Sequence, residues 1–156
     1  MKLVYNAGGQ GREVLRYLRE AEPGEEIVLV DDRDHTRAIP YPDALALKSA
    51  HDCPVFIAFG DPALRRTKTA QVEADGFALF DVHARTSVVG ERVELGPMSM
   101  LMDYAVLTAD IRIGRGFHAN LHASVSHDCI VGDFVTLGPK ATVLGRVEIG
   151  DGAYIG

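Results

Sequence analysis

From Val89 onward, an aliphatic side chain recurs at every sixth position of the chain. Eleven of these twelve positions hold Val, Leu or Ile, and the twelfth holds Ala119. Glycine directly follows seven of them. An α-helix repeats every 3.6 residues and a strand every 2, so neither produces this period. A hexapeptide repeat is typical of a β-helix, in which short strands form the flat sides of a prism. The twelve positions are Val89, Leu95, Leu101, Leu107, Ile113, Ala119, Val125, Val131, Leu137, Val143, Ile149 and Ile155.

Three six-residue sides make one coil of 18 residues, so residues 89–156 give a little under four coils of a left-handed β-helix. The recurring aliphatic side chain is expected to point inward, and the glycine after it is expected to permit the backbone conformation of each corner. Each coil buries its aliphatic residues only against its neighbours. The sequence stops at Gly156 without a capping segment, so we expect this to be a fragment of a longer β-helix.

Residues 1–82 show a different pattern, in which short apolar stretches alternate with helical ones. Alternating strands and helices predict a small parallel sheet of the Rossmann type. The predicted fold is therefore an α/β domain over residues 1–82 followed by the β-helix over residues 83–156. Strands are expected at 2–5, 25–32, 54–61 and 77–82, and helices at 12–21 and 62–76.

A glycine-rich turn, NAGGQG, follows the first predicted strand. It is similar to the dinucleotide fingerprint G-x-G-x-x-G, with Asn6 at the first glycine. Gly8, Gly9 and Gly11 would let backbone amides approach a ligand, and the helix start favours a phosphate. Asp31 and Asp32 come about twenty residues later, where a carboxylate would contact a ribose or a base. About 80 residues give half of a doubly wound domain, so we expect a single nucleotide diphosphate; a turn needed only for tight packing is the alternative.

Charge and composition exclude several partners. The formal net charge is −6 and no cluster of Lys and Arg occurs, so nucleic acid and anionic membranes are not expected partners. No apolar run approaches the roughly 20 residues that a membrane span needs. The two cysteines form no disulfide framework, and a reduced, cytoplasmic protein is predicted.

The combination of a half-size Rossmann-like domain and a β-helix resembles one family, the sialic-acid O-acetyltransferases and UDP-aminosugar (bacillosamine-type) N-acetyltransferases, the NeuD/PglD group. The resemblance covers the whole chain and is carried by the segments NAGGQGREV, LVDD, FIAFGDPALRR and VSHDCIVGDFV. It implies an acetyltransferase that moves an acetyl group from acetyl-CoA to an amino (or hydroxyl) group of a nucleotide-linked sugar or sialic acid. It also implies a homotrimer with the active groove between chains, and no metal.

The resemblance also implies roles for individual residues. His127 matches the general base and Asp128 an acidic residue that assists it, while Asn120 matches a polar contact to the acceptor sugar. On the cofactor side, Gly145 matches a backbone donor near the thioester carbonyl, and Thr136 stands where some relatives place a second histidine that reaches the cofactor. The implied nucleotide-sugar contacts are Gly8, Gly9, Gln10, Asp31, Asp32 and Gly60. Gln10 departs from the family, which has histidine there.

The chemistry of acetyl transfer suits a histidine. An amine that attacks a thioester loses a proton as the C–N bond forms, and a neutral imidazole near pH 7 accepts it. The negative charge on the tetrahedral intermediate needs a preorganised donor, such as the N–H of Gly145. On a regular strand Asp128 would point away from its neighbour His127, so its role requires a corner or a neighbouring subunit.

Two other classes of function stay open at this point. A β-helix also carries zinc in γ-type carbonic anhydrases, and the spacing of His122 and His127 is reminiscent of that arrangement, with His118 or a neighbouring chain supplying a third ligand. Alone, His118 and His122 are more often incidental. The other alternative is a non-catalytic protein that binds nucleotide sugars, which the uncapped C-terminus favours.

Overall fold

The computed structural model describes residues 1–156, which form two compact units. The first unit contains Met1–Phe59 and Thr67–Phe80, and the second contains Gly60–Arg66 and Asp81–Gly156. The short segment Gly60–Arg66 therefore groups with the hexapeptide repeats, although it lies within the first eighty residues of the sequence.

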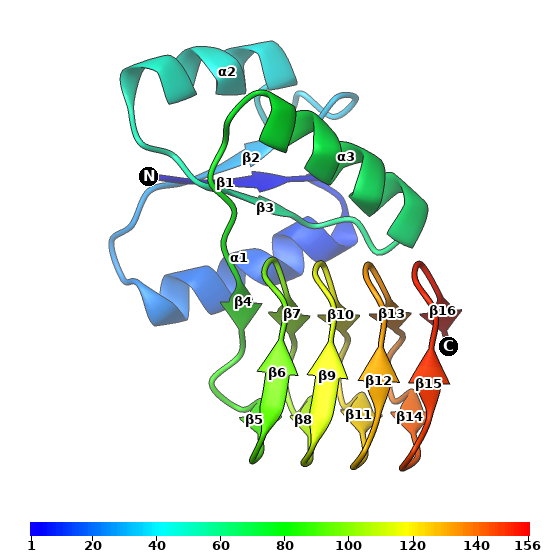
Figure 1. Ribbon diagram of the computed structural model, residues 1–156. Helices are drawn as coiled ribbons and strands as arrows, with labels where there is room; N and C mark the ends of the chain where they lie inside the picture. The colour runs from blue at the N-terminus through cyan, green and yellow to red at the C-terminus, as the bar shows by residue number, and fades with distance from the viewer. The chain divides into compact units, whose positions relative to one another are not determined.

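The first unit is built on a three-stranded parallel sheet (Figure 1). Its strands are β1 (Lys2–Tyr5), β2 (Ile27–Val30) and β3 (Val55–Ile57), in the spatial order β2-β1-β3. Leu3, Val4 and Tyr5 of the central strand are fully buried, as expected for a parallel strand covered on both faces. The carboxyl ends of the three strands therefore meet at one edge, where the glycine-rich turn begins.

Three helices complete this part of the chain: α1 (Gly9–Ala21), α2 (Tyr41–Ala50) and α3 (Pro62–Ala74). The helices α1 and α3 were both predicted, α1 from the helical spacing of its apolar residues, and α1 buries Val14 and Leu18 one turn apart. The helix α2 was not predicted, because its apolar residues form the continuous run ALAL rather than a helical stripe. None of the three has the length and apolar content that a membrane-spanning helix needs.

The strand predicted at residues 77–82 does not form as a single element. Leu79 makes only an isolated parallel bridge to Val55. Val82 instead begins β4 (Val82–His83), which pairs with β7 (Met100–Leu101) of the second unit. The apolar run was correctly identified as extended, but its two ends hydrogen-bond to different sheets.

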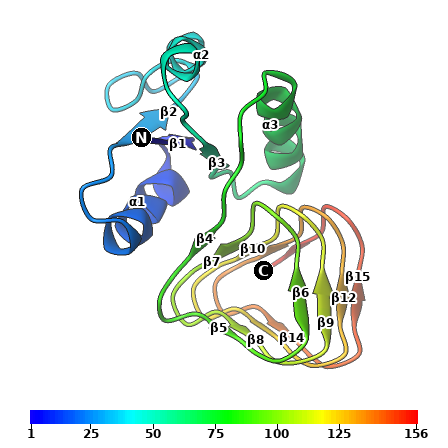
Figure 2. The ribbon, with the colours of Figure 1, turned by 60° about the vertical axis from the view of Figure 1, so that its left-hand side comes forward.

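The second unit is a parallel β-helix, in which every strand pairs with the strand 18 residues away (Figures 1 and 2). Its strands form three sheets, with the orders β16-β13-β10-β7-β4, β14-β11-β8-β5 and β15-β12-β9-β6. After β4 the strands are β5 (Val88–Val89), β6 (Val93–Leu95), β7 (Met100–Leu101), β8 (Val106–Leu107), β9 (Ile111–Ile113), β10 (His118–Ala119), β11 (Ser124–Val125), β12 (Ile130–Val131), β13 (Thr136–Leu137), β14 (Thr142–Val143), β15 (Glu148–Ile149) and β16 (Tyr154–Ile155).

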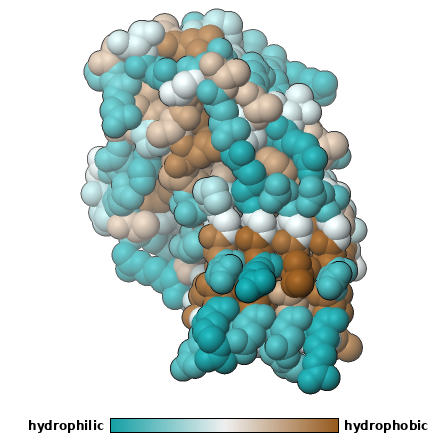
Figure 3. All heavy atoms as spheres, viewed as in Figure 1, coloured by the Kyte–Doolittle hydropathy of each residue, from teal (hydrophilic) through white to brown (hydrophobic).

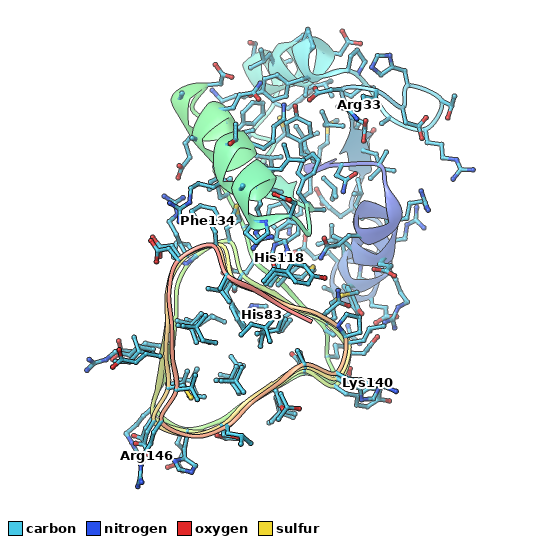
Figure 4. All side chains as sticks on the ribbon, turned by 90° about the vertical axis from the view of Figure 1, so that its right-hand side faces the viewer. Arg33, His83, His118, Phe134, Lys140 and Arg146 are labelled. Carbon is cyan, nitrogen blue, oxygen red and sulfur yellow. The ribbon has the colours of Figure 1, made fainter.

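The predicted inward side chains fill the prism. Viewed down the axis of the β-helix, the backbone traces a triangle whose three corners are marked by Phe134, Lys140 and Arg146, and aliphatic side chains point into it (Figure 4). Leu101, Leu107, Val125 and Leu137 are at most 1% exposed. Outside, on the face that carries β6, β9, β12 and β15, hydrophilic and hydrophobic bands run across the coils (Figure 3). The hexapeptide period therefore builds one continuous apolar column, as predicted.

The role expected for the glycines at the corners was wrong. The left-handed backbone conformation falls two residues after such glycines, on residues such as Arg92 (φ 54°), Phe134 (φ 55°) and Lys140 (φ 62°). The glycines serve close approach between coils instead: a Cβ added at Gly90 would lie 1.7 Å from the carbonyl oxygen of Thr108 on the next coil. Glycine is required there because any side chain would push adjacent coils apart.

Candidate active site

His127 and Asp128 occupy the corner between β11 and β12. The left-handed conformation of Asp128 turns the chain there, so its carboxylate comes beside the preceding ring instead of pointing away from it. His127 Nδ1 lies 2.7 Å from Asp128 Oδ2. The side chains of His127 and Asp128 are 57% and 51% exposed. With Nδ1 bonded to a carboxylate, Nε2 is the nitrogen left to accept a proton from another molecule.

Gly145 lies one coil, or 18 residues, beyond His127, and the imidazole sits against it. A Cβ added at Gly145 would lie 2.7 Å from Cε1 and 2.8 Å from Nε2 of the His127 ring. The backbone is fixed here because the N–H of Arg146 donates to the carbonyl of His127 at 2.9 Å. The N–H of Gly145 makes no backbone hydrogen bond within the chain. The same spot thus combines a proton acceptor, its carboxylate partner and an available donor.

Charged residues from successive coils stack along this corner. Arg92 donates to Asp110 from Nε at 2.5 Å and from Nη2 at 2.8 Å, and Arg146 Nε lies 3.9 Å from Asp128. The guanidinium of Arg92, and more weakly the nearby His127, lower the pKa of Asp110. Asp110 is therefore ionised and paired with Arg92, while Asp128 is the carboxylate hydrogen-bonded to the histidine.

A groove of about 480 Å³ runs beside this corner along the outer face of β6, β9 and β12. Asp128 and the half-exposed Ile130 contribute to its wall. Its remaining lining is mostly charged, with both signs present, and consists of Arg92, Glu94, Asp110, Arg112 and Cys129. Asp128, the carboxylate partner of His127, thus borders an open surface groove rather than a closed cavity.

Asn120 lies at a different corner, between β10 and β11. Its Oδ1 accepts a hydrogen bond from the N–H of Leu121 at 2.9 Å. The strand β11 separates Asn120 from His127, so a single chain does not bring these two predicted site residues together.

Thr136 is not at the surface in this structure. Its side chain is buried, and its Oγ1 donates to the carbonyl of Gly60 at 2.9 Å and accepts from Arg65 Nη2 at 2.9 Å. Arg65 also donates to the carbonyls of Gly116 and Val135. The Thr136 hydroxyl and the Gly60 carbonyl are thus used in internal hydrogen bonds around a buried guanidinium, and the ligand contacts expected of these two residues stay predictions.

The other two histidines that were considered as zinc ligands lie apart from His127. His118 is fully buried on β10, and burial together with the nearby Arg65 holds its pKa well below the usual value (Figure 4). His122 is exposed at another corner and stacks on Tyr104, with 4.9 Å between ring centroids. No group of three or more His, Cys, Asp or Glu side chains is placed to hold a metal ion.

The glycine-rich turn of the first unit forms around Asn6. Asn6 adopts a φ of 112°, and its side chain accepts from the N–H of Gly8 at 2.8 Å and donates to the carbonyl of Ala58 at 2.6 Å. A Cβ added at Gly11 would lie 1.7 Å from the carbonyl oxygen of Asn6. The exposed Gly9 begins α1, and no atom lies within 4 Å of a Cβ added there. Gly11 therefore serves close packing of the backbone and not the ligand approach predicted for it. A Cβ added at Gly8 would lie 2.7 Å from Asn6 Oδ1, so Gly9 is the open position of the turn, and Gln10 follows it.

Asp31 and Asp32 follow β2 at the same edge of the sheet. Asp31 accepts three backbone hydrogen bonds, one of them from the N–H of Ala7 at 2.8 Å. Asp32 accepts from the hydroxyl of Tyr5 at 2.8 Å and from Lys68 Nζ at 2.7 Å. Burial opposes ionisation of both carboxyls, but these donors outweigh it and lower both pKa values. The expected acidic pair is thus ionised at the carboxyl edge of the sheet.

The comparisons with known proteins bear on both units. Residues 3–72 match the family described as the PglD N-terminal domain. The GDP-perosamine N-acetyltransferase of Escherichia coli O157:H7 is 30% identical over 163 residues, which cover 98% of this chain and 74% of that protein. The chain belongs to the left-handed β-helix sugar acetyltransferases.

Two solved structures resemble the chain over nearly its whole length. WeeI from Acinetobacter baumannii AYE is 32% identical with a TM-score of 0.93, covering 99% of this chain and 76% of that one. A histidine-to-asparagine mutant of perosamine N-acetyltransferase from Caulobacter crescentus, in complex with CoA and GDP-perosamine, is 28% identical with a TM-score of 0.90, covering 98% and 75%. The predicted fold class is confirmed, and neither a zinc enzyme nor a non-catalytic binder is favoured.

Two residues at the sites were missed by sequence reasoning, Arg65 and Lys68. Both lie on α3, and although Arg65 falls within the segment FIAFGDPALRR, neither residue was assigned a role of its own. Arg65 reads as one of several basic residues on an ordinary surface helix, yet it is fully buried. A cation whose partners are carbonyls and residues far away in sequence leaves no local motif, so only the structure identifies it.

Proposed function

We propose that this acetyltransferase moves the acetyl group of acetyl-CoA to the amino group of a GDP-linked amino sugar, with His127 as the general base. The observation that carries the proposal is the 2.7 Å contact between His127 Nδ1 and Asp128 Oδ2 beside Gly145. The named relatives support the substrate class, because one is a GDP-perosamine N-acetyltransferase and another is a complex with CoA and GDP-perosamine.

His127 Nε2 accepts the proton of the attacking amine. The amine nitrogen forms a bond to the thioester carbonyl carbon while that proton passes to Nε2, and the tetrahedral intermediate then expels the thiolate of CoA. The protonated ring can return the proton to the leaving sulfur, so the base is regenerated in each turnover. Asp128 stabilises the imidazolium and fixes the tautomer in which Nε2 is the acceptor.

The N–H of Gly145 is the proposed donor to the oxyanion. It belongs to a backbone that the hydrogen bond from Arg146 to His127 holds in place, so little reorganisation is needed when charge develops. Its freedom from any backbone acceptor within the chain leaves the donor available for the thioester oxygen.

The two parts of the sequence have separate proposed tasks. Residues 1–82 would bind the nucleotide, with Gly8, Gly9 and Gln10 near the diphosphate and the two aspartates after β2 near the nucleoside. Residues 83–156 would carry the acetyl transfer. Gly60 and Thr136 are left out of the proposed ligand contacts, because their polar groups bond to each other at 2.9 Å.

We also propose a homotrimer. Within one chain Asn120 and His127 lie at separate corners, so the predicted acceptor contact of Asn120 would have to be made toward the His127 of a neighbouring protomer. Large apolar side chains on the outer surface of the β-helix, such as Leu144 at 69% and Ile130 at 50% exposure, are suited to such a contact. Both cysteines are free thiols, which is consistent with action in the reducing cytoplasm.

Acetyl transfer to a GDP-linked 4-amino sugar tests the proposal, measured as release of the CoA thiol and as the mass of the product. We expect His127→Asn to lower kcat about 10²–10⁴-fold. His51→Asn is the matched control, because His51 is exposed at the end of α2 in the other unit. Turnover by His127→Asn at the wild-type rate would remove this residue from the base role.

A further inference from the structure

The two carboxylates after β2 have different tasks in this structure. Asp31 Oδ2 accepts from the N–H of Ala7 at 2.8 Å, and Oδ1 accepts from the N–H groups of Arg33 at 2.9 Å and Asp34 at 3.0 Å. These bonds fasten the glycine-rich turn after β1 to the loop after β2. Asp31 is therefore engaged by the backbone and holds the turn in shape.

Asp32 is held by side chains instead. Both of its oxygens lie 2.8 Å from the hydroxyl of Tyr5, and Oδ2 also lies 2.7 Å from Lys68 Nζ. The Asp32 side chain is 43% exposed. Because each carboxylate oxygen can accept two hydrogen bonds, Asp32 retains acceptor capacity on its exposed side.

Lys68 is committed to this arrangement. An ammonium has three N–H donors, and Lys68 Nζ lies 2.7 Å from Asp32, 2.9 Å from the Tyr5 hydroxyl and 3.1 Å from Gln71 Oε1. Its side chain is only 18% exposed, and Nζ lies 5.0 Å from the centroid of the Tyr5 ring. With its donors used internally, Lys68 acts on a ligand through Asp32 rather than by direct contact.

Lys68 also offsets part of the negative charge of the carboxylates near the proposed site of the nucleotide diphosphate. Asp31, Asp32 and Asp34 place three carboxylates within four residues, beside the glycine turn proposed for a diphosphate. Such a cluster would repel a polyanionic ligand. The ammonium 2.7 Å from Asp32 offsets one of these charges without removing an acceptor.

An exposed carboxylate that only accepts hydrogen bonds requires a ligand group with donors. The ribose of a nucleotide offers two adjacent hydroxyl donors, whereas its phosphates offer none. Asp32 follows β2 at the carboxyl edge of the parallel sheet, which is where open α/β sheets bind ligands. We infer that Lys68, together with Tyr5, is a positioning residue that aims the Asp32 carboxylate at the ribose diol of the nucleotide. This inference rests on the proposed nucleotide-sugar function.

The affinities of the full chain for GDP and 2′-deoxy-GDP, measured by calorimetry, test this inference. We expect the wild type to prefer GDP by about ten- to a hundredfold, because a hydrogen bond to a charged acceptor is lost with the 2′-hydroxyl. Asp32→Asn and Lys68→Met should both reduce this preference to about threefold or less, and Lys68→Arg should restore most of it. In acetyl transfer, Lys68→Met should raise KM for the nucleotide sugar and leave kcat unchanged.

Lys48→Met is the matched control, because Lys48 lies in the same unit and contacts only the edge of the fold near Gly76 and Phe77. A merely structural Lys68 would weaken both nucleotides equally, so an unchanged ribose-to-deoxyribose ratio in folded Lys68→Met would overturn the inference. The same titrations with UDP and 2′-deoxy-UDP separate the two proposals. If the wild type prefers UDP, the proposal of GDP as the nucleotide is refuted, but the ratio of affinities for UDP and 2′-deoxy-UDP still tests the role of Lys68. If the wild type binds neither nucleotide, both proposals are refuted.

Discussion

Replacing Gly145 with alanine should displace the His127 ring while leaving the fold and the backbone N–H of residue 145 in place. The added Cβ would lie 2.7 Å from Cε1, 2.8 Å from Nε2 and 3.1 Å from Nδ1 of His127. Carbon atoms pack at about 3.5–4.0 Å, so the exposed ring has to retreat by roughly 1 Å. A displacement of about 1 Å costs on the order of 10²-fold in rate. We therefore expect kcat to fall about a hundredfold.

Folding should be nearly unaffected by the same substitution. The φ of Gly145 lies outside the left-handed region, and the atoms in the way belong to a half-exposed side chain that can move. We expect the free energy of unfolding to change by less than about 1 kcal/mol. Alanine also keeps the N–H of residue 145, so a loss of activity reports the ring and not the proposed oxyanion donor.

The assay is steady-state acetyl transfer together with thermal unfolding of each variant. Gly150→Ala is the matched control, because no atom lies within 4 Å of a Cβ added at Gly150. A double variant with His127→Asn should be no slower than His127→Asn alone, since both changes act through one ring. Wild-type kcat in Gly145→Ala, or a further loss in the double variant, would refute the reasoning.

Two further predictions concern the buried cluster around Thr136. Burial lowers the pKa of Arg65 to about 10, yet it remains charged and hydrogen-bonds to three carbonyls and a hydroxyl. Arg65→Met removes the donor to the carbonyl of Gly116 and one of two donors to each of the carbonyls of Gly60 and Val135. It should lower the free energy of unfolding by about 1–3 kcal/mol in chemical denaturation; an equally stable variant would show that the cluster contributes nothing. His118 is buried, and its pKa in the native state lies well below its value of about 6.5 in the unfolded chain. Below pH 6.5 the unfolded chain therefore binds a proton that the native state does not, so the free energy of unfolding falls as the pH decreases. His118→Gln should reduce that slope by up to about 1.4 kcal/mol per pH unit between pH 6 and 5, and an unchanged slope would mean that His118 does not titrate on unfolding.

The β-helix could be predicted from the sequence because its rule is periodic and local. One aliphatic residue in six is enough to place Val125 and Val143 in one column, and the structure pairs them in that register. The corner conformation could not be read from the same pattern. Glycine is frequent one residue after the aliphatic position, where at Gly90 it permits close approach of the neighbouring coil, and the left-handed residue comes two places later, with several kinds of side chain.

Contacts between distant residues explain the remaining misses. Lys68 meets Asp32 across 36 positions of sequence, and Arg65 meets Thr136 across 71. Neither pair belongs to a motif, because each depends on how α3 is placed by the fold. Thr136, in contrast, was singled out from the sequence because it matches a family position, and only the structure shows that its side chain is buried against Gly60.

The corner at Asp128 shows how the repeat itself creates a catalytic arrangement. On a flat strand, adjacent side chains point to opposite faces, so His127 and Asp128 could not touch. The left-handed residue that every coil needs for its turn brings them to 2.7 Å. The 18-residue coil then sets Gly145 against the ring, where any larger residue would displace it. The left-handed corner residue is present at every coil, but it forms a catalytic arrangement only where the corner carries His127 and Asp128 and where the next coil places Gly145 against the ring.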